Sequence, residues 1–402
     1  MARTLPAPYA DRPRPTRTVP VQRQSDFHSL VLGIVWLTIA SGAVVMTEPA
    51  PFDALMLGLI VLLPIAGLVV VTPAMMMLLA VFLILAATGL GGAVISLDMT
   101  KSVTHTLITL YLSVAAIIIA GFIHKSPLRH ARLILDAYLV SAVLCAGLGI
   151  VGYFDLFPGA ADLFTSFGRA RGAFKDPNVF GPYLVPPIVY GIHLWLTRPL
   201  HRGLWPLAAV VLLAFALFLG FSRGSWFNLA VALAAFAYMS FLTAASNWAR
   251  FKLTAAVVAG AGLIAVGTLV LMHVDGIAKI AEQRLTLDQS YDQGPEGRFG
   301  GQAKAIRLIG EHPLGIGAGE FTQRHHHEEV HNVYLSMMLN NGWAGGILYA
   351  LIVLVSVLFG LRQVMRGSPA RPYLIIAVSC LAGVAVEGFV IDTDHWRSFF
   401  LL

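Results

Sequence analysis

The chain has 402 residues, of which 57% are hydrophobic and only 12% are charged, and its mean hydropathy is +0.76. A soluble domain carries roughly twice that charged fraction, so the composition excludes an ordinary soluble protein. The net charge of +6 would suggest nucleic-acid binding in a soluble chain. Here the basic residues lie mostly in short loops between apolar segments, where membrane topology accounts for them. We therefore expect membrane lipids, and no nucleic acid, among the partners of this protein.

The apolar residues form segments of about twenty, the length that a helix needs to cross a hydrocarbon core roughly 30 Å thick. Because backbone polar groups must be paired within lipid, such segments are predicted to be helices. The predicted fold class is therefore all-α, a polytopic integral membrane protein with about eleven transmembrane helices. The predicted spans are residues 27–47, 54–72, 74–92, 103–124, 133–153, 179–197, 204–222, 225–244, 251–273, 332–361 and 372–391.

The spans divide the chain into four parts. Residues 1–26 are rich in proline and arginine without an apolar segment, which predicts a disordered cytoplasmic tail. Residues 27–273 contain predicted spans one to nine, and residues 274–331 form one large polar loop. Residues 332–402 contain spans ten and eleven, and the apolar run Phe399-Phe400-Leu401-Leu402 is interpreted as the start of a twelfth span that the sequence does not complete.

Basic and acidic loops alternate along the chain. Cytoplasmic loops are enriched in lysine and arginine, so we place the N-terminus and the basic loops in the cytoplasm. The large loop 274–331 then lies on the periplasmic side of the inner (plasma) membrane. The basic loops lie at residues 125–132, 198–202, 250–252 and 362–371.

Two arginines are candidates for binding an anion. Arg223 lies in Phe221-Ser222-Arg223-Gly224-Ser225, where one predicted span ends and the next begins. An arginine at bilayer depth costs about 2.5–3.5 kcal/mol on insertion scales. It is either an interfacial residue with its head group in water or an anion clamp, because guanidinium binds phosphate bidentately and stays protonated. Arg298, in the large loop, precedes a predicted amphipathic helix that runs through Ile309.

His331 opens the tenth predicted span. A histidine at the edge of a membrane cavity can act as a base, because its unperturbed pKa is about 6.5; the alternative is an ordinary surface histidine. The segment His327-Glu328-Glu329-Val330-His331 also matches the H-E-x-x-H helix signature of zinc proteases, without a third ligand at a recognisable spacing. The glycine run at residues 315–319 follows no predicted strand, which favours a compact turn over a phosphate-binding loop.

Several of these segments resemble the O-antigen ligase and polysaccharide polymerase family of membrane glycosyltransferases. The resemblance covers most of the chain. It rests on the order and spacing of the segments and on the large loop before the histidine motif. The segments are Gly172-Ala173-Phe174, Asp176-Pro177-Asn178-Val179-Phe180-Gly181, Ser222-Arg223-Gly224, Gly297-Arg298, His312-Pro313-Leu314-Gly315-Ile316-Gly317, His331-Asn332-Val333-Tyr334-Leu335 and Asn341-Gly342-Trp343-Ala344-Gly345.

The resemblance implies transfer of a glycan from polyprenyl diphosphate to an acceptor hydroxyl on the periplasmic face, with no metal and no cofactor. Arg223 and Arg298 match the arginines expected to hold the donor diphosphate, and His331 matches the expected catalytic base. The acceptor would be lipid-linked or a glycan, and the sequence leaves ligase and polymerase both open. Further candidates for contact with the substrate are Lys175, Asn178 and Tyr334.

Two other classes of function stay open from the sequence. A membrane zinc protease would use the segment 327–331, and chelators would inactivate it. A secondary transporter would carry polar groups and broken helices near the midplane of the bilayer. The interiors of the predicted spans are almost free of charge, with Glu387 as the exception, and the two halves of the chain show no obvious repeat.

We expect residue 128 to be cytoplasmic and residue 290 to be periplasmic, because the loops that contain them are assigned to opposite sides by their charge. Fusing a reporter that is active only in the periplasm at each position measures this directly. The fusion at residue 290 should be active and the fusion at residue 128 inactive. Equal activity at both positions would contradict the topology.

Overall fold

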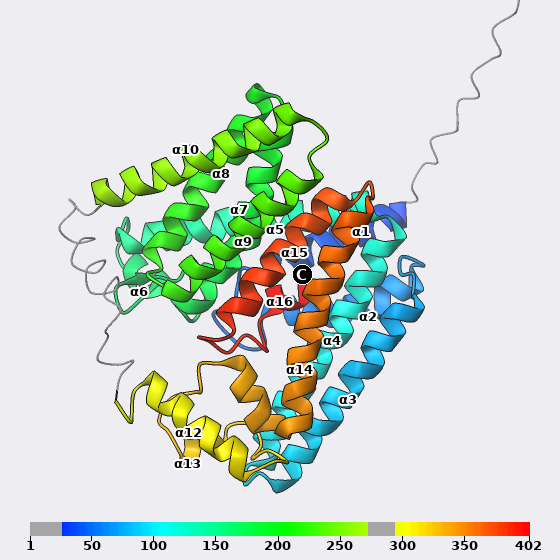
Figure 1. The fold of residues 1–402 in the computed structure, drawn as a ribbon, viewed down its shortest axis with the longest axis vertical. Helices are drawn as coiled ribbons and strands as arrows, with labels where there is room; N and C mark the ends of the chain where they lie inside the picture. Colours follow the sequence, from blue (N-terminus) through cyan, green and yellow to red (C-terminus); the bar gives the residue numbers. More distant parts are fainter. Residues whose placement is uncertain (1–25, 272–293) are drawn as a thin grey trace, which may run out of the picture.

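The computed structural model describes residues 26–271 and 294–402 (Figure 1). The predicted tail at 1–26 and the first third of the predicted loop at 274–331 therefore lie largely outside the described residues. Within the described part, the only sheet is a hairpin of two short strands, β1 (Thr165–Ser166) and β2 (Arg169–Ala170). All other regular structure there is helical, which confirms the all-α fold class.

Each predicted span overlaps one helix. Seven of the described helices are long and apolar enough to cross a membrane, and α1 and α2 are shorter apolar helices. The chain is thus a multi-pass membrane protein. That it crosses the membrane eleven times remains a prediction. These helices are α1 Asp26–Ser41, α2 Pro51–Ile65, α3 Pro73–Ile95, α4 Met99–Lys125, α5 Pro127–Tyr153, α7 Pro177–Thr197, α8 Leu200–Leu219, α9 Arg223–Thr243, α10 Asn247–Leu271, α14 Val333–Arg366 and α15 Arg371–Glu387.

Four shorter helices lie outside the predicted spans. The helix α12 (Arg298–Glu311) confirms the amphipathic helix expected after Arg298. Figure 1 shows α12 and α13 together at one end of the molecule, near the start of α14. The other short helices are α6 Ala160–Phe164, α13 Glu320–Arg324 and α16 Arg397–Leu401.

Helix α1 is shorter than predicted. It ends at Ser41, whereas the predicted span runs to residue 47. The chain then becomes extended, and the Val45 N–H donates a hydrogen bond of 2.8 Å to the Ala173 carbonyl. An extended segment must pair its backbone groups outside a helix, and this pairing brings the α1–α2 connection against the segment that precedes α7.

The glycine run at 315–319 forms the predicted compact turn. Gly315, Gly317 and Gly319 have φ angles of +85°, +86° and +82°, a region that favours glycine because it has no Cβ. A Cβ on Gly315 would lie 2.6 Å from the nitrogen of Gly342. Gly342 itself has a φ of +70° and interrupts α14. The turn is therefore packed into the break in α14, and it positions the first turns of that helix.

Residues 388–402 return to the helix bundle. The short helix α16 contacts α4, and the Arg397 guanidinium forms two hydrogen bonds with the Asp53 carboxylate of α2, at 2.8 and 2.6 Å. The Tyr111 hydroxyl of α4 lies 3.4 Å from the same carboxylate. The segment that was interpreted as the start of a twelfth span thus folds against α2 and α4 as a five-residue helix.

We expect Arg397→Gln to lower the free energy of unfolding by about 3–5 kcal/mol, because it leaves a buried carboxylate without its partner. The Arg397 and Asp53 side chains are only 18% and 12% exposed. The thermal unfolding midpoint of the protein in detergent measures the effect. The control is Arg307→Gln, which removes an exposed pair with Glu311 and should change the midpoint little. Equal midpoints for both variants would show that the buried pair does not hold the segment.

Candidate functional site

One end of the helix bundle gathers the starts of α7, α9 and α14 and the end of α15, and we call it the site end. Helices α7 and α15 both pack against α9. The Val333 N–H at the start of α14 donates a hydrogen bond of 2.9 Å to the Gly388 carbonyl just beyond α15. Helix N-termini carry a partial positive charge, so three converging N-termini favour negative charge at this end.

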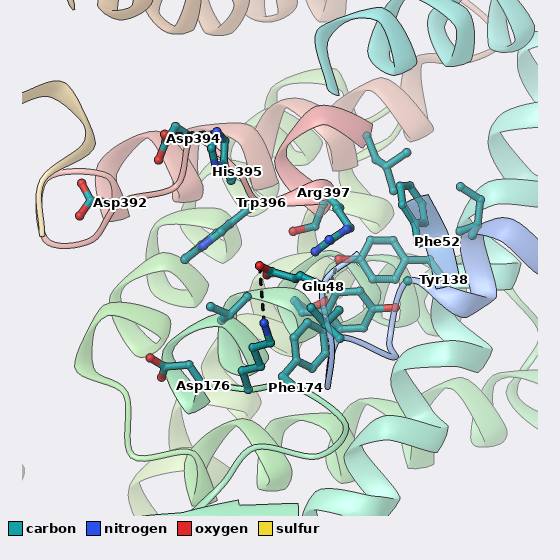
Figure 2. A pocket seen from close by; sticks show the side chains of 18 residues that line it. Glu48, Phe52, Tyr138, Phe174, Asp176, Asp392, Asp394, His395, Trp396 and Arg397 are labelled. Atoms are coloured by element: carbon teal, nitrogen blue, oxygen red, sulfur yellow. Dashed lines mark hydrogen bonds and ion pairs between the residues drawn. The ribbon is translucent and has the colours of Figure 1, made fainter. Parts of the chain in front are cut away.

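A cavity of about 300 Å³ lies at the site end (Figure 2). Its walls come from the end of α1, the α1–α2 connection, the segment before α7, and residues 392–401. Figure 2 shows aromatic rings and charged side chains around the same space, an arrangement in which a few polar groups can orient a ligand against an apolar wall. The labelled side chains are Glu48, Phe52, Tyr138, Phe174, Asp176, Asp392, Asp394, His395, Trp396 and Arg397.

Neighbouring side chains hold both backbone polar groups of His331. Its φ angle of +54° lies in the left-handed region, which is uncommon for a residue other than glycine. Asp392 Oδ2 accepts a hydrogen bond of 3.0 Å from the His331 N–H, and Gln302 Nε2 donates one of 3.2 Å to its carbonyl. Such a conformation persists only where the surroundings fix it. His331 is therefore positioned by α12 and by the segment after α15.

The residue after His331 starts helix α14. The Asn332 side chain accepts hydrogen bonds from the N–H groups of Tyr334 (3.1 Å) and Leu335 (3.2 Å), which makes it the N-cap. The Tyr334 hydroxyl donates a hydrogen bond of 2.6 Å to the Ala385 carbonyl of α15. The motif of residues 331–335 thus has a structural explanation: it caps α14, ties it to α15 and places the histidine just outside the helix.

The His331 imidazole lies among charges of both signs. Its Nε2 is 3.6 Å from Glu328 Oε2, and Arg298 and Asp176 are close enough to affect its charge. Burial, followed by the Arg298 charge, lowers the pKa of His331 below its usual value, against the opposite effect of the two carboxylates. The imidazole is therefore neutral near pH 7 and free to accept a proton. Arg298 and His331, predicted from separate motifs, lie together.

Asp392 connects His331 with the cavity. Its Oδ2 accepts from the His331 N–H, its Oδ1 accepts a hydrogen bond of 2.6 Å from the Ser336 hydroxyl, and its side chain lines the cavity. Burial, followed by the neighbouring Asp394 carboxylate, raises the pKa of Asp392 to about 7. The histidine and the cavity thus share one wall.

Two further residues predicted from the sequence lie at the site end. Lys175 lines the cavity, with Nζ 3.5 Å from Glu48 Oε2, and the dashed line in Figure 2 marks this ion pair. Arg223 is the first residue of α9 and is half-buried. The next residue, Gly224, packs so closely that a Cβ there would lie 3.0 Å from Glu387 Oε1. Arg223 therefore lies beside the end of α15.

Asn178 and Tyr334, which were also predicted to contact the substrate, bind other parts of the protein instead of lining the cavity. The Asn178 side chain accepts a hydrogen bond of 2.7 Å from Arg169, and its N–H donates one of 2.7 Å to the Asp176 carboxylate. The Tyr334 hydroxyl is bonded to α15, as described above. Among the residues of the described chain that line the cavity, neither Asn178 nor Tyr334 occurs. Both fix the ends of helices that carry the site.

The H-E-x-x-H segment lacks the geometry of a zinc protease. Residues 327–331 form an irregular segment between α13 and α14, so the two imidazoles do not lie one helical turn apart. Instead, Glu328 lies between them, 3.8 Å from His327 Nε2 and 3.6 Å from His331 Nε2. The helix on which the zinc-protease interpretation depends is absent from this segment.

The sequence did not predict that residues between 392 and 397 line the cavity, because they follow the eleventh predicted span and were given no role. A signal was present, because the run Asp392-Thr393-Asp394-His395-Trp396-Arg397 contains two carboxylates, an imidazole, an indole and a guanidinium in six residues. Such a run beside an apolar segment is unlike a plain connecting loop. Its place in the cavity wall depends on the return of the chain to α2 and α4.

Comparison with protein families agrees with the resemblance seen in the sequence. Residues 208–350 match the family model described as O-antigen ligase. This range contains Arg223, Arg298 and His331. The match supports an O-antigen ligase-like family, the family that the sequence resembles. None of the curated proteins matches the sequence.

We expect the pKa of His331 to lie below about 6.5, the unperturbed value, and Glu328→Gln to lower it further. This variant removes a negative charge near Nε2, whereas Arg298→Gln removes a positive charge and should raise the pKa. Diethylpyrocarbonate reacts with neutral imidazole, so its rate of reaction with His331 against pH, followed by mass spectrometry of the peptide, reports the pKa. The exposed His201 is an internal reference for reagent activity. An unchanged pKa in both variants would contradict the charge environment described here.

Proposed function

Because residues 208–350 match O-antigen ligase, we propose that this protein is a membrane glycosyltransferase of the O-antigen ligase or polymerase type. It transfers a glycan from a polyprenyl-diphosphate-linked donor to a hydroxyl of a lipid-linked or glycan acceptor. The main support is a neutral, positioned histidine, His331, which lies near Arg298 and whose N–H is bound by Asp392 in the wall of a cavity lined by polar and aromatic groups.

His331 supplies the base. As the acceptor oxygen forms a bond to the anomeric carbon, the bond from that carbon to the diphosphate oxygen breaks, and the acceptor proton moves to Nε2 of His331. The Glu328 carboxylate, 3.6 Å from Nε2, then stabilises the imidazolium. A base works best when it is mostly unprotonated at the working pH, and the lowered pKa of His331 meets this condition.

The two arginines hold the leaving diphosphate. Arg223 and Arg298 are each the first residue of a helix, α9 and α12. Each side chain therefore extends from a helix N-terminus, whose free backbone N–H groups also attract phosphate. Permanently charged groups that are held in place stabilise the negative charge that develops on the leaving group. This arrangement needs no metal for the departure of the diphosphate.

The cavity receives the acceptor. The aromatic rings of Trp396, Phe174 and Phe52 offer apolar surface for the faces of a sugar ring, and the carboxylates of Asp176 and Asp392 accept hydrogen bonds from sugar hydroxyls. Both cations in the lining are paired with carboxylates, Lys175 with Glu48 and Arg397 with Asp53. The cavity is thus better suited to hydroxyl groups than to a diphosphate, which leaves the diphosphate to Arg223 and Arg298.

We propose further that the site end faces the periplasm across the inner membrane. The predicted cytoplasmic N-terminus precedes α1, and the chain that leaves the other end of α1 reaches Glu48 in the cavity wall. One crossing therefore separates the tail from the cavity. The large loop that contains Arg298 and His331 belongs to the same side.

We expect His331→Ala to reduce glycan transfer by roughly 10²–10⁴-fold, the usual contribution of a positioned general base. Donor binding should persist in this variant, because the arginines are intact. In Arg298→Lys, binding of the polyprenyl-diphosphate donor should weaken, since lysine keeps the charge and loses the bidentate fork. Transfer of lipid-linked glycan in a strain that lacks the native gene, together with donor binding to the purified protein, separates the two roles.

The matched control is His327→Ala, an exposed histidine four residues before His331, which should transfer glycan almost normally with or without EDTA. Equal losses in His327→Ala and His331→Ala, with recovery after addition of zinc, would replace the proposed mechanism with metal-dependent chemistry. Near-normal transfer by His331→Ala would remove the histidine from the reaction.

A further inference from the structure

Three side chains of metal-binding type converge from distant parts of the sequence. His105 lies in the second turn of α4, and Asp394 and His395 lie in the segment between α15 and α16. Asp394 Oδ2 is 3.1 Å from His105 Nε2 and 3.8 Å from His395 Nε2, and the three donor atoms all lie within 4.8 Å of one another. Asp394 is buried, and the histidines are half-buried.

Two of the three distances among these donor atoms are close to those of a tetrahedral zinc site that has three protein ligands. With Zn–N and Zn–O bonds of about 2.0–2.1 Å, two ligand atoms in a tetrahedral site lie about 3.3 Å apart. The distances of 3.1 and 3.8 Å bracket that value. Two imidazoles and one carboxylate are also a preferred ligand set for Zn²⁺, with the fourth position left to water.

Hydrogen bonding to Asp394 accounts for His105 only, because His395 Nε2 lies too far from the carboxylate for a hydrogen bond. Both Nε2 atoms approach the same carboxylate oxygen, and the two imidazole rings are only 4.2 Å apart between centroids. Two protonated rings at this distance would repel each other, whereas a metal ion binds both in the neutral form. The Thr109 hydroxyl, 3.0 Å from His395 Nε2, also lies 3.2 Å from the His105 carbonyl, to which it donates. His395 Nε2 therefore either donates its own proton to the Thr109 hydroxyl or, when deprotonated, has a lone pair that can bind a metal ion.

The surrounding charge also suits a cation. Glu329 is exposed but near enough to His105 and Asp394 for their charges to interact. It adds a second carboxylate beside the three ligands, while Lys101 balances part of its charge. A divalent ion with two carboxylates in reach leaves the cluster close to neutral, which reduces the cost of burying the charges.

We propose that His105, Asp394 and His395 bind a divalent transition metal ion, with Zn²⁺ as the preferred ion. The ion joins α4 to the segment after α15. Asp392, two residues before the ligand Asp394, accepts the His331 N–H. The metal therefore has a structural role, in fixing the wall of the cavity. None of its three ligands belongs to the H-E-x-x-H segment, from which only Glu329 lies nearby, and the ion takes no part in the transfer chemistry proposed above.

The experiment uses Co²⁺ as a spectroscopic probe on the untagged, full-length protein in detergent, after removal of metals with EDTA. A second cluster of Glu296, His326 and His327 could also bind metal, and two of its three members are exposed. All measurements are therefore made in a His327→Ala background. We expect one Co²⁺ per chain, visible bands of a tetrahedral site, loss of the bands on addition of Zn²⁺, and a higher thermal midpoint with Zn²⁺ than with EDTA.

His105→Gln and His395→Gln, each added to the His327→Ala background, should lose the bands and the Zn²⁺-dependent rise of the midpoint. His312→Gln, which changes an exposed histidine outside the cluster, is the matched control and should keep both. If a cluster variant does not fold, X-ray absorption of the zinc-loaded parent protein tests the site instead. The spectrum gives the number of imidazole ligands of the ion, and we expect two. A parent protein that binds no Co²⁺, or cluster variants that bind it unchanged, would show that the three residues are a hydrogen-bonded cluster only.

Discussion

The ion pair between Arg397 and Asp53 is the interaction on which the site most depends. Two charged side chains with little exposure are costly to desolvate, and the bidentate contact offsets that cost only when both partners stay in place. The pair holds residues 392–401 against α2 and α4. That segment supplies a large part of the cavity wall, and its Asp392 positions the backbone of His331. A contact between two residues that lie 66 and 278 positions from His331 in the sequence therefore sets the position of the proposed base.

Helix ends supply the rest of the site. Arg223 and Arg298 begin α9 and α12, Asp176 caps α7, and Asn332 caps α14. A long apolar helix cannot carry much charge in its interior, so polar groups concentrate where helices begin and end, at the boundary of the bilayer. At these positions each charged side chain adds to the field of the helix terminus. This explains how a chain with so few charged residues can form a strongly polar site on one side.

The position of His331 accounts for its chemical state. The histidine is partly covered and lies between a guanidinium and two carboxylates, so that burial and Arg298 keep it neutral while Glu328 remains near enough to stabilise a transient positive charge. Its left-handed backbone is held from both sides by Asp392 and Gln302. A base that is positioned in this way before the substrate binds loses little entropy on reaction. The same backbone conformation also prevents the zinc-protease geometry. The segment that holds His331 is not a helix, so the H-E-x-x-H residues cannot take the positions that a zinc protease needs.

The sequence by itself determined the membrane class, the approximate helices and the residues Arg223, Arg298 and His331 as candidates, because apolar length and local motifs depend on neighbouring residues only. It also gave the compact glycine turn and the helix after Arg298. The sequence could not show that α1 ends early. That end follows from the hydrogen bond between the Val45 N–H and the carbonyl of Ala173, which lies far along the chain. Nor could the sequence assign a role to Asp392, Asp394, His395 and Arg397. Their partners lie in α2, α4 and the start of α14, between 56 and 344 positions away in the sequence. Buried charges must be paired, and only the tertiary structure decides which distant polar groups meet.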